Sequence, residues 1–319
     1  MNFDLLVTNI TNPAFLFFVL GVLAFRLKSD LEIPPNSSKF ISLYLLFSIG
    51  FKGGQELSHE TITGEVLLSI LFGILVSLLI PVYTFFILKR RLNVHDAAAI
   101  AAAYGSVSAV TFVTAVAYLD YQQMQLHGHM VAIMALMESP AIIAGLILLS
   151  LYSGSKKSGI ATASVLKHSF TNGSVLLILG SLAIGFLANA KQAEGIKPFT
   201  NDIFKGFLAI FLLDMGVTSG RKLSSFVTYG IFPFLFAVFI PLINGIVFTF
   251  LSSFITSEIS SRFIFGVLAA SASYIAVPAA MKMAVPKADP GLYVPMALAV
   301  TFPVNITIGL PLYLAVAGY

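Results

Sequence analysis

The chain has 319 residues, of which 58% are hydrophobic and only 10% are charged, and its mean hydropathy is +0.94. Soluble domains contain about 25% charged residues, so this composition excludes an ordinary soluble domain and favours a membrane protein with several spans. The absence of cysteine excludes a disulfide framework and thiol chemistry. The net charge of +4 does not indicate nucleic-acid binding, because Lys and Arg gather in short loops, as they do in membrane proteins.

The sequence predicts ten apolar segments long enough to be membrane helices, the first of them short. A period-two barrel pattern is not seen, so helices are predicted. The segments are Pro13–Leu27, Lys39–Gly54, Ile62–Leu88, Ala97–Leu119, Met130–Tyr152, Gly173–Ala190, Phe199–Gly220, Phe226–Ile255, Phe263–Ala284 and Leu292–Ala317.

The predicted spans fall into two groups of five. Residues 1–152 form the first group, residues 153–171 a cytoplasmic linker, and residues 172–319 the second group. An odd number of spans reverses the orientation of the second half, so the halves are predicted to be an inverted repeat. Four matches occur in the same order in both halves: Leu20–Ala24 with Leu179–Ala183, Ile49–Leu57 with Met215–Leu223, Ser106 with Ser273, and Pro140 with Pro303.

The distribution of basic residues predicts the orientation of the chain. Loops on one side carry 13 of the 18 Lys and Arg residues, so this side is expected to be cytoplasmic. Both termini then face outward in a multi-pass protein of the plasma (inner) membrane, with lipid around it.

Two of the predicted spans are interrupted at matching places. The first carries Tyr104–Phe112 and the second carries Ser271–Pro278, both rich in small and hydroxyl residues. Unwound backbone must line a cavity or bind something, because unpaired backbone groups are too costly against lipid. Ser108 is predicted to cap one resuming helix, and Pro278 suits the first turn of the other. The alternative is two helices kinked for close packing.

Helix N-termini that meet near the middle of the membrane would bind a small anion. Carbonyl groups freed at the same breaks would suit Na⁺. The predicted anion-binding residues are Gly105, Ser106, Val107, Ser108, Ser271, Ala272, Ser273 and Tyr274, and the predicted sodium ligands are Ser108, Thr111, Glu138, Ala276 and Asn305.

Polar residues inside spans are functional candidates. Glu138 and Asn305 offer oxygen ligands from the fifth and tenth spans. A simple interhelical hydrogen bond is the alternative for Asn305. Asp214 is another carboxylate within a span, nearer its cytoplasmic end, and a cap or an ion pair with Arg221 or Lys222 is the alternative for it.

Enzymatic activity is not predicted. His127 and His129 are a weak metal signal, because no third ligand lies near them in the sequence. A hydrolase triad would need a His within a predicted span, and the predicted spans contain none. Phosphate-binding glycine motifs are also missing, which argues against direct use of ATP.

Three stretches, Tyr104–Phe112, Ser271–Ala280 and Leu298–Asn305, resemble the SbtA-type sodium-dependent bicarbonate transporters of cyanobacteria, and the resemblance runs through all ten predicted spans. It implies a homotrimer of ten-helix protomers, each with a core and a gate domain, and Na⁺-coupled uptake of bicarbonate for carbon concentration. It also implies control by a cytoplasmic PII-like regulator.

The residues themselves indicate only a small anion. A Na⁺-coupled carrier of another small anion or organic acid, and a cation/proton antiporter, are therefore alternatives. The antiporter would need a titrating carboxylate at the crossing, and neither interrupted stretch contains one.

Overall fold

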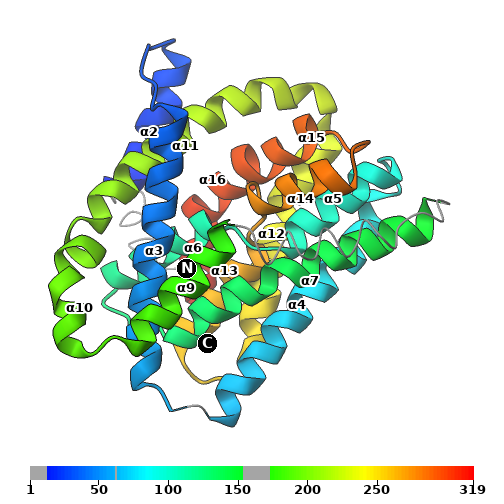
Figure 1. The fold of residues 1–319 in the computed structure, drawn as a ribbon. Coiled ribbons are helices and arrows are strands. Elements are labelled where there is room, and N and C mark those ends of the chain that lie inside the picture. The colour runs from blue at the N-terminus through cyan, green and yellow to red at the C-terminus, as the bar shows by residue number, and fades with distance from the viewer. Residues whose placement is uncertain (1–12, 62, 154–172) are drawn as a thin grey trace.

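The computed structural model describes residues 13–61, 63–153 and 173–319. Regular structure within these ranges is helical, and Figure 1 shows the helices in one bundle. Most of the predicted linker, residues 154–171, lies outside the described residues. The first half contains α2 (Pro13–Arg26), α3 (Pro35–His59), α4 (Gly64–Leu88), α5 (Val94–Gly105), α6 (Ala109–Tyr121) and α7 (Gly128–Tyr152).

The second half repeats this sequence of long and interrupted helices, and its last span is divided by π-helical turns. It contains α9 (Gly173–Leu187), α10 (Ala190–Lys197), η1 (Pro198–Asp202), α11 (Phe204–Phe226), η2 (Val227–Tyr229), α12 (Ile231–Ser252), α13 (Ile259–Ala270), α14 (Ala276–Ala284), α15 (Pro290–Pro295), η3 (Met296–Thr301), α16 (Phe302–Val304), η4 (Asn305–Gly309) and α17 (Leu310–Ala317).

Six helical segments of the described part are long and apolar enough to cross a membrane, and three shorter apolar helices accompany them. Helix α3 begins before and ends after its predicted span Lys39–Gly54. The difference arises because hydropathy marks only the apolar middle of a helix, whereas its polar ends extend further. Together with the composition, these helices indicate a multi-pass membrane protein.

Helices α2, α3 and α10 lie on the left of the view in Figure 1, and α4 and α5 lie on the right. Two helix pairs pack closely. Helix α2 packs against α11, and α3 packs against α9. Small residues allow helix backbones to approach closely in membranes.

Glycines hold α2 and α11 together. A Cβ atom at Gly21 would lie 2.1 Å from the carbonyl oxygen of Leu213, and one at Gly216 would lie 2.1 Å from that of Phe18. Both distances are far too short for a side chain, so this pair requires glycine at both positions.

The pair formed by α3 and α9 makes the same contacts. A Cβ atom at Gly54 would lie 2.1 Å from the carbonyl oxygen of Leu182, and one at Gly185 would lie 2.2 Å from that of Phe51. In this pair too, a glycine of each half of the chain lies against a backbone carbonyl group of the other half.

These contacts change the alignment of the two halves. The sequence matched Gly21 with Gly180 and Gly50 with Gly216, but the contacts match Gly21 with Gly185 and Gly54 with Gly216. A Cβ atom at Gly180 would meet nothing within 4 Å. The sequence alignment therefore selected glycines by their apolar surroundings rather than by their packing role.

Candidate functional site

Two interrupted helices meet in the interior, as predicted. Helix α5 ends at Gly105 and α6 begins at Ala109, while α13 ends at Ala270 and α14 begins at Ala276. The breaks are buried among the surrounding helices, with Ser106 and Ser271 at most 1% exposed. Unwound backbone at this depth must find its hydrogen-bond partners inside the protein.

Two long-range hydrogen bonds join the breaks. The backbone N–H of Ser108 donates to the Ser271 hydroxyl oxygen at 3.0 Å, and the backbone N–H of Ser273 donates to the Ala103 carbonyl at 2.8 Å. The Ser271 hydroxyl in turn donates to the Leu268 carbonyl at 2.9 Å. The N–H groups of Ser108 and Ser273 are thus occupied in this conformation and tie the two interrupted helices together.

Each resuming helix has a serine at its start. The Ser108 hydroxyl accepts from the backbone N–H of Thr111 at 3.2 Å, which confirms the predicted cap of α6. The Ser273 hydroxyl accepts from the backbone N–H of Val277 at 3.2 Å. Pro278 lies in the first turn of α14, also as predicted. These contacts fix the direction of both helix N-termini at the crossing.

A small cavity of about 30 Å³ lies beside the crossing. Ala109 and Val110, which begin α6, line it, and the first turn of a helix has N–H groups without intrahelical partners. Glu138 of α7 also lines the cavity. Its side chain is buried, and its Oε1 atom has no hydrogen-bond partner within the described residues. The cavity therefore combines a helix N-terminus with a buried carboxylate.

The cavity includes only some of the predicted site residues. Those that line it are Val107, Ser108, Glu138, Ser273, Tyr274 and Ala276. Those that do not line it are Gly105, Ser106, Thr111, Ser271, Ala272 and Asn305. We call this space the central cavity.

Gly105 has a packing role. A Cβ atom here would lie 2.2 Å from Cγ of Pro81 and 3.1 Å from the carbonyl oxygen of Ser77, both in α4. The sequence suggested that this glycine lets backbone approach an anion, but the structure shows α4 on that side. A larger residue at Gly105 would therefore disturb the packing of α5 against α4.

Asn305 makes two interhelical contacts. Its side-chain amide donates to the Ala270 carbonyl at 2.8 Å, and its side-chain oxygen accepts from the Tyr313 hydroxyl at 2.8 Å. Asn244 of α12 donates to the neighbouring Ala269 carbonyl at 3.3 Å. The two asparagines thus satisfy carbonyl groups freed at the end of α13, which is the alternative that the sequence left open for Asn305.

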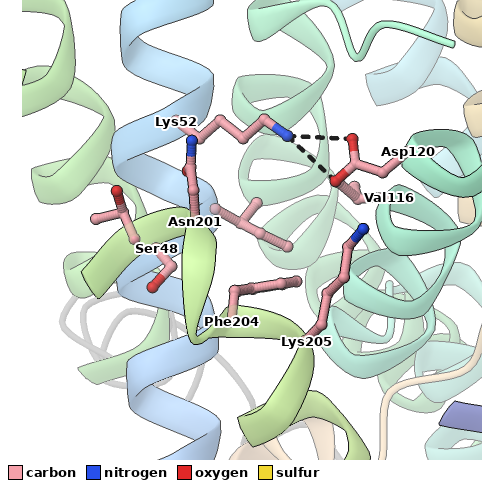
Figure 2. Close-up of a pocket in the computed structure, with 9 residues that line it drawn as sticks. Ser48, Lys52, Val116, Asp120, Asn201, Phe204 and Lys205 are labelled. Carbon is pink, nitrogen blue, oxygen red and sulfur yellow. Dashed lines mark hydrogen bonds and ion pairs between the residues drawn. The ribbon is translucent and has the colours of Figure 1, made fainter. Parts of the chain in front are cut away.

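A second cavity, which we call the Lys52 cavity, has a volume of about 320 Å³ and lies between α3, α6 and the start of α11. Figure 2 shows Lys52 and Lys205 extending into it, with Lys52 paired to Asp120 at 3.1 Å. The sequence analysis did not predict this cavity. The available signal was the position of Lys52 inside the predicted span Lys39–Gly54, where a basic residue is unusual.

A third cavity of about 410 Å³ lies at the other ends of α3 and α11, and we call it the Asp214 cavity. Asp214 lines it and accepts a hydrogen bond from the Ser38 hydroxyl. Tyr274 and Ile275, from the break between α13 and α14, line both this cavity and the central cavity. The Lys52 cavity contacts the interrupted helices through α6, where Val116 lines it.

Comparison with known proteins identifies the family of the chain. Comparison with individual curated proteins gave no match. The family model described as the Na⁺-dependent bicarbonate transporter superfamily matches residues 13–318, nearly the whole chain. The resemblance noted in the interrupted stretches is thereby confirmed at the level of the family. The chain belongs to the Na⁺-dependent bicarbonate transporter superfamily.

Proposed function

We propose that this protein is a Na⁺:bicarbonate symporter that works by alternating access. The observation that carries the proposal is the central cavity, where the capped start of α6, the break before α14 and the buried carboxylate of Glu138 meet. Membership of the superfamily supports sodium and bicarbonate as the transported ions.

Bicarbonate is proposed to bind at the N-terminus of α6. The partial positive charge of a helix start and its free N–H groups favour an anion without the help of Lys or Arg. Ser273 and Tyr274 face the same cavity from the other break. Because the Ser108 and Ser273 N–H groups are engaged across the breaks, we expect the anion to contact Ala109 and Val110 first.

Sodium is proposed to bind at Glu138. Na⁺ prefers oxygen ligands, and Glu138, whose Oε1 has no hydrogen-bond partner among the described residues, lines the cavity together with Ser108 and Ala276. A cation here would offset the charge of bicarbonate, so each ion would raise the affinity for the other by the same factor. Asn305 would support the site indirectly by holding the end of α13.

The proposed architecture is a ten-helix protomer with two inverted five-helix repeats, residues 1–152 and 172–319. The similar glycine contacts in the α2–α11 and α3–α9 pairs, each joining a helix of one half to a helix of the other, support this architecture. These four helices would form the gate domain, and the other spans would form the core domain. A homotrimer and a cytoplasmic PII-like regulator, with a role in carbon concentration, complete the proposal on the basis of family resemblance.

Alternating access would use the two larger cavities in turn. The Asp214 cavity contacts Tyr274 and Ile275 at the break. In the proposed orientation this cavity opens to the cytoplasm, so the conformation described here would face inward. The Lys52 cavity would be the outer approach, where two lysines attract bicarbonate before it reaches the centre.

The orientation is tested by labelling, and the natural chain without cysteine makes this direct. Single substitutions Tyr319→Cys and Arg90→Cys are exposed to a membrane-impermeant maleimide in intact cells. The proposal of outward termini in the inner membrane predicts labelling of Tyr319→Cys only. Labelling of Arg90→Cys alone would show that the chain has the opposite orientation.

Uptake into proteoliposomes tests the function itself. Labelled bicarbonate is expected to accumulate only when an inward Na⁺ gradient is present, and K⁺ in place of Na⁺ is the control. Accumulation driven equally well by K⁺ or by a proton gradient would overturn sodium coupling. Accumulation of another anion in preference to bicarbonate would overturn the proposal that bicarbonate is the substrate.

A further inference from the structure

Two histidines and a carboxylate gather where α3 ends and α7 begins. Glu60 follows the last residue of α3, His127 is the N-cap residue of α7, and His129 lies in the first turn of α7. The two histidines are close in the chain, but Glu60 lies 69 positions before His129. Sequence spacing therefore could not reveal the group.

The three side chains present their ligand atoms to one point. Nδ1 of His129 lies 2.8 Å from Oε2 of Glu60, and Nδ1 of His127 lies 3.5 Å from Oε1 of Glu60. One ligand atom from each residue lies within 4.8 Å of the other two. Ligand atoms around a tetrahedral zinc ion lie about 3.3 Å apart, given zinc–nitrogen distances of about 2.0–2.1 Å. The group thus already has nearly the spacing that such an ion requires.

A further carboxylate supports the orientation of one histidine. Nε2 of His127, the nitrogen that faces away from Glu60, lies 3.8 Å from Oε2 of Glu258. A metal-bound histidine usually donates its other ring N–H to a carboxylate, which fixes the tautomer and the ring orientation. Glu258 is the N-cap residue of α13, so the arrangement connects three helices.

The group is partly open to solvent and has one further polar contact. The backbone N–H of Gly128 donates to Oε1 of Glu60 at 2.6 Å. The side chains of Glu60 and His129 are 17% and 11% exposed, so an ion can reach them from solvent. A carboxylate with two imidazoles is a ligand set that suits Zn²⁺ and similar transition metals.

We propose that Glu60, His127 and His129 form a transition-metal site, with Glu258 as a positioning residue for His127. Three protein ligands would leave a fourth position for water. A bound ion would replace the hydrogen bond between His129 and Glu60 and hold the ends of α3 and α7 together. This site goes beyond the transport function, since none of its residues lines the central cavity.

Zinc titration of the purified full-length protein in detergent tests the site, using an affinity tag without histidine and protein stripped with a chelator. Calorimetry with Zn²⁺ alone is expected to show one saturable site per chain. His127→Ala and His129→Ala should each weaken binding at least about tenfold, and Glu258→Gln about tenfold. His59→Ala is the matched control and should bind zinc like the parent, because His59 lies next to Glu60 but outside the group.

Two measurements on the unsubstituted protein keep the test independent of variant folding. Co²⁺ should develop the visible absorption of a nitrogen- and oxygen-bound ion, and Zn²⁺ should raise the unfolding temperature. Failure of the unsubstituted protein to bind Zn²⁺ saturably would overturn the site, as would unchanged binding in both histidine variants. Neither result depends on transport, so the proposed function would stand or fall separately.

Discussion

Glu138 and Asn305 are both buried polar residues inside predicted spans, but their surroundings give them different roles. Glu138 lines the central cavity and its Oε1 has no hydrogen-bond partner among the described residues. Asn305 has its side-chain amide and oxygen engaged by Ala270 and Tyr313. A buried group without a partner is costly, so Glu138 is the residue of the two that calls for a ligand.

The first prediction concerns the charge of Glu138. Glu138→Gln keeps the shape and one oxygen of the side chain but removes the charge that would attract Na⁺. Apparent Na⁺ affinity for bicarbonate uptake should fall about tenfold, which corresponds to about 1.4 kcal/mol, while uptake at saturating Na⁺ falls less. Glu65→Gln, which changes an exposed carboxylate at the start of α4, is the control. An unaltered Na⁺ dependence in Glu138→Gln would make this residue structural.

The second prediction concerns Asn305. Asn305→Ala leaves the Ala270 carbonyl and the Tyr313 hydroxyl without this partner, which should destabilise the protein by about 1–3 kcal/mol. The measurement is the unfolding temperature in detergent, followed by the Na⁺ dependence of uptake in protein that remains folded. Parental stability combined with weakened Na⁺ affinity would instead identify Asn305 as a sodium ligand.

At the scale of the helices, one face of α3 makes a row of polar contacts. Lys52 and Glu56 lie one turn apart on the same face of α3, and Glu60 follows directly after the helix ends. They contact the segment around the connection between α6 and α7, with Lys52 bonded to Asp120, Glu56 to Gln125 and Glu60 to His129. Meanwhile glycines on another part of α3 pack directly against α9. One helix thus joins the proposed gate and core domains.

The third prediction separates two glycines of α9. A Cβ atom at Gly185 would lie 2.2 Å from the Phe51 carbonyl oxygen, whereas one at Gly180 would meet nothing within 4 Å. Gly185→Ala should therefore destabilise the α3–α9 pair by about 1–3 kcal/mol through overpacking, and Gly180→Ala should not. Thermal unfolding of the two variants provides the comparison, and equal stability would contradict the packing described here.

At the scale of the whole molecule, the three cavities lie along the proposed route. The Lys52 cavity and the Asp214 cavity lie at opposite ends of α3 and α11, and the central cavity shares Tyr274 and Ile275 with the latter. Coupled transport through such a route is driven by the ion gradient and, when net charge moves, by the membrane potential. The stoichiometry therefore decides how far bicarbonate can be concentrated.

The fourth prediction concerns this stoichiometry. One Na⁺ per bicarbonate moves no net charge, and a tenfold Na⁺ gradient then supplies about 1.4 kcal/mol, enough for about tenfold accumulation. A second Na⁺ would add the same amount and about 2.3 kcal/mol per 100 mV of membrane potential. Because Glu138 is the one carboxylate among the described residues that line the central cavity, we expect the electroneutral ratio. Uptake in proteoliposomes should then be unchanged when valinomycin and K⁺ set the potential to zero, and a strong decrease would indicate a second Na⁺.

The sequence by itself determined the features that depend on local chemistry. Long apolar segments predicted the helices, and small polar stretches predicted the two breaks. The hydroxyl of Ser108 and the ring of Pro278 predicted where α6 and α14 resume, because caps and first-turn prolines act within a few residues. The stretches around these breaks also carried the resemblance to the superfamily whose family model matches the chain.

Only the tertiary structure decided which residues of different helices meet. Gly105 contacts Pro81 of α4, Gly185 rather than Gly180 packs on α3, and Glu60 joins His127 and His129. Each of these contacts joins residues far apart in the chain, and their partners depend on how helices are rotated and shifted against one another. Hydropathy and spacing do not contain that information, because in a membrane the outer faces of helices are as apolar as their packed faces.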